Sequence, residues 1–197
     1  MRILMVVLLL GAIMGCQPSD AQDAPARPGK ADPASLPEGY LVEDIPGSEA
    51  QRVVKRDEEG KIAEEGMLYD GLKMGAWIAY HEGGVFPAKI TTYAEGVQNG
   101  TYLEFNTRGH LTLRATYKNN KLDGPWALYS FGRPEKEAHY KNGELDGVYL
   151  EYNRKTGNLQ KEAHYKNGVQ HGTYRFYSEE GEVMLEVEYI DGVKQEG

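Results

Sequence analysis

The sequence predicts an all-β fold: an elongated, single-layer antiparallel meander of about six stacked β-hairpins. Three observations predict it. Tyrosines recur about every 24 residues, glycines recur at fixed places between them, and the segments between the glycines alternate apolar and polar side chains. A fixed period of this length is the signature of a repeat architecture, in which each unit is one small element stacked on its neighbours.

Residues 1–15 have the composition of a secretory signal peptide. Arg2 is followed by an apolar run that ends at Met14, and then by Gly15 and Cys16. The run is too short to span a bilayer, which requires about 20 apolar residues, but it suits the core of a cleaved signal. The segment resembles a bacterial lipoprotein signal, which implies that Cys16 is diacylated and becomes the mature N-terminus.

Lipidation at Cys16 would anchor the protein to a membrane without a membrane span, because two acyl chains hold a protein stably at a bilayer. Cys16 is the only cysteine, so an intramolecular disulfide is excluded. The next residue is Gln17 and not the Asp that marks inner-membrane retention in enteric-type sorting. The expected location is therefore the cell envelope, with the outer membrane favoured and the leaflet left open.

Residues 16–50 are predicted to form the lipidated cysteine and a flexible tether. This segment is rich in Pro, Ala and Asp and shows no hydrophobic periodicity. Such a chain extends by about 3.1 Å per residue where it is polyproline-like, so it can hold a domain well away from a membrane.

The formal net charge of −8 argues against two classes of partner. An acidic surface repels phosphate backbones, whose binding depends on clustered Lys and Arg. Nucleic acid is therefore not expected as a partner, and the membrane is expected to be contacted through the lipid anchor only.

Residues 51–197 are predicted to form the repeat domain. In residues 110–117 and 182–189 every second side chain is apolar, which is typical of a half-buried strand. A short aromatic segment bounded by glycine, such as GTYLEF, precedes the first of these strands and is expected to be its antiparallel partner. Each unit is therefore a hairpin.

Tight turns are predicted after the strands that end in the repeated tyrosines. Gly or Asn occupies one position in each of these turns, and both residue types tolerate a positive φ. Asn-Gly and Asp-Gly are also strong hairpin signals. The predicted turn residues are Gly71, Gly96, Asn120, Gly143, Gly168 and Gly192.

Two aromatic residues recur in each unit, three positions apart, and are therefore expected on opposite faces of the sheet. No helix pattern is present to supply a second layer, so the rings are expected to stack from repeat to repeat and to leave an apolar surface for binding. The residues of this predicted binding surface are Trp77, Tyr80, Tyr102, Phe105, Trp126, Tyr129, Tyr149, Tyr152, Tyr174 and Tyr177.

The unit can be written G-x-[WY]-x-x-[YF]-x-x-x-G-x-[LV]-x-x-x-x-x-Y-x-[ND]-G-x-x-x-G, and it resembles the bacterial variant of the MORN repeat. The resemblance covers about residues 51–197. It implies an elongated sheet of stacked hairpins used for protein or membrane recognition. Many bacterial members are labelled antitoxin components, and that label fits an exported lipoprotein poorly.

The octapeptide KEAHYKNG occurs at residues 136–143 and again at 161–168, and it raises the question of a duplicated metal or catalytic site. His139 and His164 would be two strands apart, about 9 to 10 Å between Cα atoms, which is far for a shared zinc ion. No nucleophile motif or phosphate-binding glycine loop is present. We expect these residues to be repeat architecture, with no enzyme activity, no cofactor and no metal.

The sequence favours a non-catalytic, lipid-anchored module that recognises a protein of the cell envelope. Carbohydrate or cell-wall binding is the main alternative, because short aromatic hairpins also occur in glycan-binding repeats. An antitoxin-like role, in which the chain neutralises a partner toxin, is a further alternative. The identity of the partner and the oligomeric state are left open.

Overall fold

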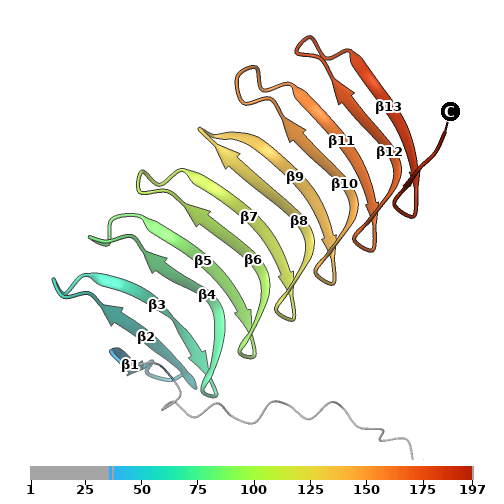
Figure 1. Ribbon diagram of the computed structural model, residues 1–197. Helices are drawn as coiled ribbons and strands as arrows, with labels where there is room; N and C mark the ends of the chain where they lie inside the picture. The colour runs from blue at the N-terminus through green and yellow to red at the C-terminus, as the bar shows by residue number, and fades with distance from the viewer. Residues whose placement is uncertain (1–35, 37, 197) are drawn as a thin grey trace, which may run out of the picture.

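The computed structural model describes Leu36 and residues 38–196, and these form one open antiparallel sheet of 14 strands in strict chain order. Figure 1 shows the strands side by side from β1 to β13, all bowed in the same direction. The predicted all-β, single-layer meander is confirmed. The strands are β1 (Tyr40–Asp44), β2 (Ala50–Arg56), β3 (Ile62–Tyr69), β4 (Leu72–Tyr80), β5 (Pro87–Ala94), β6 (Val97–Phe105), β7 (Leu111–Lys118), β8 (Lys121–Ser130), β9 (Arg133–Lys141), β10 (Glu144–Tyr152), β11 (Leu159–Lys166), β12 (Val169–Tyr177), β13 (Val183–Ile190) and β14 (Val193–Lys194).

The sheet begins before the predicted repeat domain. β1 pairs antiparallel with β2, and Tyr40 lies opposite Lys55. The end of the segment assigned to the tether is therefore a strand. It was missed because β1 is short and lacks the repeat glycines. The predicted signal peptide, Cys16 and most of the tether lie outside the described residues.

One edge of the sheet, which we call the turn edge, carries two-residue turns with positive φ from β3 to β14, beside the longer β1–β2 connection at residues 45–49. In the turn between β9 and β10, for example, φ is 54° at Asn142 and 94° at Gly143. Two successive positive φ values match the twist of the flanking strands, so they favour a tight hairpin. All six predicted turn residues have positive φ: Gly71, Gly96, Asn120, Gly143, Gly168 and Gly192.

Successive turns along the turn edge are hydrogen-bonded to the preceding hairpin. The amide of Gly143 donates to the carbonyl of Leu122 at 2.7 Å. The carboxylate of Asp123 accepts the amide of Asn142 at 3.0 Å. One unit later, Asp146 accepts the amide of Asn167 in the same way. The backbone groups that a tight turn leaves unpaired are thus satisfied by the neighbouring repeat.

A glycine bulge interrupts the aromatic strands. In the β5–β6 pair, Thr91 lies opposite Tyr102 but Tyr93 lies opposite Gln98, so extra residues of β6 are accommodated around Gly100. Gly100 has φ +111°, and a Cβ there would lie 3.2 Å from the Thr92 side chain. The sequence pattern predicts these glycines at the ends of strands, but the strands continue through them. Bulges of this kind bend a strand. The equivalent glycines are Gly75, Gly124, Gly147 and Gly172.

The other edge of the sheet, which we call the loop edge, carries longer connections in all but one of the repeats. These are residues 57–61, 81–86, 106–110, 153–158 and 178–182, whereas β8 and β9 are joined by Phe131 and Gly132 alone. The described residues contain no helix that is long and apolar enough to cross a membrane.

Candidate binding face

One face of the sheet carries a row of aromatic rings, which we call the ring face. The ring two positions after each bulge glycine packs edge to face against the repeated tyrosine of the next strand. Trp126 and Tyr140, for example, have centroids 6.4 Å apart and planes at 68°. Such pairs contribute about 0.5 to 1.5 kcal/mol beyond the area that they bury. The ring face comprises Trp77, Tyr93, Tyr102, Tyr117, Trp126, Tyr140, Tyr149, Tyr165, Tyr174 and Tyr189.

Small residues lie beneath these rings and form the core of the later repeats. Ala163 is directly opposite Tyr149 on β10 and Tyr174 on β12, and it is fully buried. Ala138 occupies the same place between Trp126 and Tyr149. Rings on flanking strands can close over an alanine, whereas a larger side chain would hold them apart. The rings therefore provide the cover that a second layer provides in other sheets.

Trp77 differs from the other rings because the N-terminal segment covers it. Tyr40 lies against it at a centroid distance of 6.4 Å, and Leu36 packs on the same cluster, which includes the buried Val53 and Leu68. The indole is 2% exposed. Trp77 was predicted to belong to the binding surface, but it is a core residue and offers no free ring.

Three contacts fix Trp77 in this core. Its indole N–H donates to the carbonyl of Met67 at 3.1 Å. The ring lies flat over the backbone at Gly66, where any Cβ would collide with it. The ammonium of Lys73 lies 3.8 Å from the ring centroid, and burial lowers the pKa of this lysine. Cation–π attraction compensates part of that desolvation.

Cations also lie over the rings in the later repeats. The ammonium of Lys161 is 5.3 Å from the centroid of Tyr149 and 5.8 Å from that of Tyr174. Lys136 pairs with Glu151 at 3.7 Å, and a hydrogen bond with the Tyr149 hydroxyl raises the pKa of this lysine. The open part of the ring face thus presents half-buried aromatic rings together with charged groups.

The second recurring aromatic lies on the opposite face, as predicted. Its hydroxyl donates to a glutamate of the preceding strand: Tyr152 donates to Glu137 at 2.7 Å, and Tyr177 donates to Glu162 at 2.8 Å. Burial and this hydrogen bond raise the pKa of Tyr152 to about 12. The remaining predicted binding residues on this face are Tyr80, Phe105 and Tyr129.

Phe105 shows that this tyrosine–glutamate pair is a matched unit. Phe105 has no hydroxyl, and the position that carries glutamate in the pairs of Tyr80, Tyr152 and Tyr177 carries Ile90 instead. A half-buried carboxylate without a donor would cost free energy, and at Phe105 both members are replaced together, whereas at Tyr129 the position of the glutamate carries Arg114. The hydroxyl groups of Tyr80, Tyr152 and Tyr177 on the opposite face are therefore already satisfied within the sheet.

His139 and His164 of the repeated octapeptide lie against the bulge glycines. A Cβ at Gly147 would come within 3.2 Å of His139, and one at Gly172 within 3.1 Å of His164. His139 Nδ1 is 3.0 Å from the carbonyl oxygen of Asp146. His164 Nδ1 is likewise 2.8 Å from the carbonyl oxygen of Thr173. The side chains cover the bulges, which is a role in the architecture of the hairpin.

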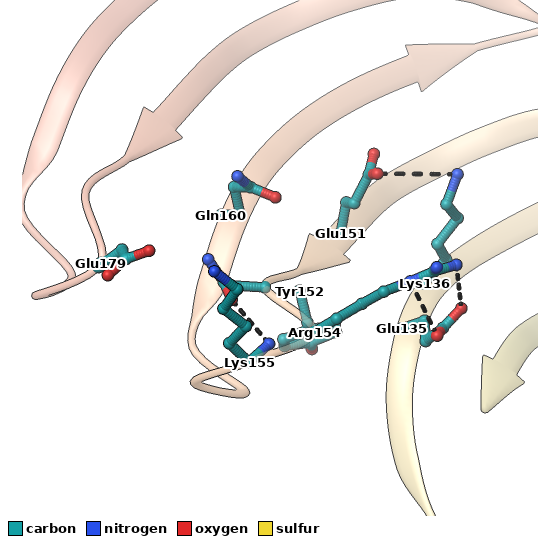
Figure 2. A pocket seen from close by; sticks show the side chains of 9 residues that line it. Glu135, Lys136, Glu151, Tyr152, Arg154, Lys155, Gln160 and Glu179 are labelled. Atoms are coloured by element: carbon teal, nitrogen blue, oxygen red, sulfur yellow. Dashed lines mark hydrogen bonds and ion pairs between the residues drawn. The ribbon is translucent and has the colours of Figure 1, made fainter. Parts of the chain in front are cut away.

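Within the part of the chain that the structure describes, no three His, Cys, Asp or Glu side chains come together as a metal site. A hollow of about 400 Å³ near the loop edge holds mainly charged side chains that pair with one another (Figure 2). There the Arg154 guanidinium lies 3.0 Å from the Glu135 carboxylate. Chemically, this hollow offers a polar surface of mixed charge.

Comparison with known proteins agrees with the repeat pattern. Residues 170–191, which span most of β12 and β13, match the family described as MORN repeat variant. A comparison with curated proteins finds no match. MORN repeats are generally binding repeats without catalytic activity. The resemblance that the sequence indicated is thus confirmed for this segment: residues 170–191 of the β-sheet match the MORN repeat variant.

Proposed function

We propose that this protein is a lipid-anchored, non-catalytic binding module that recognises another protein of the cell envelope. The lipoprotein-type signal ending at Cys16 supports the anchor, and the Pro-rich segment after it supports a tether. The repeat sheet supports the binding role.

The observation that carries the proposal is the open ring face from β6 to β13. Its rings are half-buried by one another, and among the described residues no second layer covers them. Aromatic residues, Tyr and Trp above all, are enriched at the centres of protein interfaces. The edge-to-face geometry gives few flat, free ring surfaces, so it favours a protein over a sugar as the partner.

Two tyrosines of β12 provide a matched test. Tyr174 lies on the ring face and Tyr177 on the opposite face of the same strand. We would crosslink the full-length protein in its cells, purify it by affinity, and compare Tyr174→Ser with Tyr177→Ser. The expected result is loss of a reproducible envelope partner with Tyr174→Ser and its retention with Tyr177→Ser, provided that circular dichroism shows both to be folded.

Other outcomes would redirect the proposal. Equal loss in both variants would mean that the ring face is not the contact, and no partner with the parent protein would count against protein binding altogether. Retention on purified peptidoglycan or glycans that Tyr174→Ser abolishes would instead support carbohydrate binding.

The anchor is tested separately. Cys16→Ser should move the protein from the membrane fraction to the soluble fraction, because the thiol that carries the first lipid is removed. A variant that still fractionates with membranes would show that the predicted lipidation is wrong.

A further inference from the structure

Phe131 is an almost fully exposed phenylalanine in an unfavourable backbone conformation. It forms the two-residue turn between β8 and β9, its side chain is 95% exposed, and its φ is +50°. Every other described residue with positive φ is Gly, Asn, Asp or Glu. A bulky side chain in this region is a steric outlier. Strained residues of this kind are typical of functional sites, where they are kept for what they contact.

The surroundings of Phe131 form a notch in the loop edge. Its turn has two residues, whereas the loops of the hairpins on either side, 106–110 and 153–158, are longer. A hollow of about 390 Å³ lies on one side of Phe131 and includes Leu111 and Tyr129. Another of about 310 Å³ lies on the other side and includes Arg133 and Pro134. The ring thus stands between two hollows, each large enough for a side chain.

The charge of the loop edge changes sign at this notch. The two outer loops are acidic: residues 57–61 include three carboxylates, and so do residues 178–182. The connections around Phe131 carry the exposed basic side chains of Arg108, Arg133, Arg154 and Lys155. Arg154 also pairs with Glu135, as Figure 2 shows. In a protein of net charge −8, this is a local basic patch around an exposed ring.

We propose that this notch is a second docking site, which takes an acidic segment of a partner protein. Carboxylates of the segment would meet the guanidinium groups of Arg108 and Arg133, and an apolar side chain of the segment would pack on the Phe131 ring. Arg and aromatic residues are the side chains that most often dominate binding energy, and Arg–carboxylate pairs supply directional hydrogen bonds. The site adds to the ring face and does not depend on it.

Photocrosslinking tests the site directly. We would replace Phe131 by p-benzoylphenylalanine, a photoreactive residue of similar shape, in cells that make the full-length protein. The matched control carries it at the exposed Glu58, in the acidic loop 57–61 of the same edge. The expected result is a discrete protein adduct at position 131 alone, with the crosslinked peptide rich in Asp and Glu by mass spectrometry.

Charge-reversal variants distinguish a specific crosslink at the notch from a nonspecific one. Arg133→Glu or Arg108→Glu should lower the adduct yield at least about tenfold, as expected when one partner of an interfacial charge pair is removed. Lys141→Glu, at the turn edge, should leave the yield unchanged. An adduct with lipid, an adduct insensitive to these reversals, or no adduct at position 131 would overturn the proposal. The comparison of Tyr174→Ser with Tyr177→Ser tests the proposed function separately, so the two proposals can fail independently.

The variant Phe131→Asn tests whether Phe131 is kept for binding and not for folding. Asn tolerates positive φ, so this variant should have a higher unfolding midpoint than the parent and yet lose the adduct formed by a benzoylphenylalanine at Tyr129. A lower midpoint, or an unchanged adduct, would show that Phe131 is a structural residue.

Discussion

The two tryptophans occupy the same repeat position in two regions of the sheet, and their environments differ. Trp77, in β4, is 2% exposed beneath Tyr40 and Leu36. Trp126, in β8, is half-buried and covered only by its edge-to-face partner and the neighbouring strands. The repeat therefore determines the face and the ring pairing of a residue, whereas its burial depends on what lies beyond the repeat.

This difference shows that the two ends of the sheet are capped to different extents. A repeat cannot bury its own apolar face, so terminal units need a cap. The segment from Leu36 to β1 caps the first repeats and creates the cluster of Val53, Leu68 and Trp77. At the other end Val183 and Leu185 of β13 are half exposed. We therefore expect the first repeats to be the most stable and the last to open first.

High pH should have the largest effect, because it acts on many tyrosines of the sheet together. Burial raises the pKa values of Tyr102, Tyr117, Tyr149 and Tyr165, so the fold favours their neutral form. The stability that these groups contribute is complete below the unfolded tyrosine pKa of about 10 and is lost as pH rises through the higher folded values. We expect unfolding between about pH 10 and pH 12.

Single-tryptophan variants would locate this transition. With Trp77→Phe the fluorescence reports on Trp126, and with Trp126→Phe it reports on Trp77. The Trp126 signal should change at the lower pH, together with tyrosinate absorbance. Simultaneous changes of both signals would show that the sheet unfolds as one unit and that the two regions do not differ in stability.

Truncation of the two tryptophans gives the next largest effect. Trp77→Ala should lower the free energy of unfolding by about 3 to 5 kcal/mol, as for a buried aromatic residue. Trp126→Ala should lower it by about 2 kcal/mol, because roughly half as much surface is involved. Urea denaturation measures both. Equal losses of unfolding free energy in the two variants would show that the capped Trp77 and the uncapped Trp126 do not differ in their contribution to stability.

Gly143→Val tests the turn edge of an uncapped repeat. A Cβ at Gly143 would meet no atom within 4 Å, so the penalty comes from its φ of +94° alone. A β-branched residue there should cost about 1 to 2 kcal/mol. Gly143→Asn, which tolerates positive φ, should cost less in the same thermal melt. If the two variants melted alike, backbone conformation would not be what the turn requires.

The smallest effect is expected from the paired histidines. His139→Gln together with His164→Gln should change stability by about 0.5 kcal/mol or less, because such partly exposed substitutions usually do. Added zinc should not shift the melting temperature of the parent. Zinc stabilisation seen in the parent and absent in the double variant would revive the duplicated metal site.

Much of the fold could be predicted because the same turn and aromatic signals recur in each repeat unit. Positive φ at Gly143 or Gly168 follows from the Asn-Gly turns, and the placement of Tyr149 and Tyr152 on opposite faces follows from their spacing. The cap could not be predicted, since β1 and Leu36 carry no repeat signal. For the same reason Trp77 was assigned to the binding surface.

The bulges and the notch were missed for different reasons. Gly100 and its equivalents form a clear sequence pattern. A glycine at the end of a strand and a glycine within a bulged strand, however, give the same pattern. Phe131 fell outside the repeated positions. Its signal was a shortened loop: the glycine that follows it, Gly132, arrives early in its unit.

The strict chain order of the strands has a consequence for how the protein folds. The substantial contacts between strands join each strand only to the one before and the one after it, so the contact order is low for an all-β protein. Each pairing closes a short loop, and low contact order favours fast folding. The sheet can therefore assemble progressively from its N-terminal end, each new strand using the last as its template.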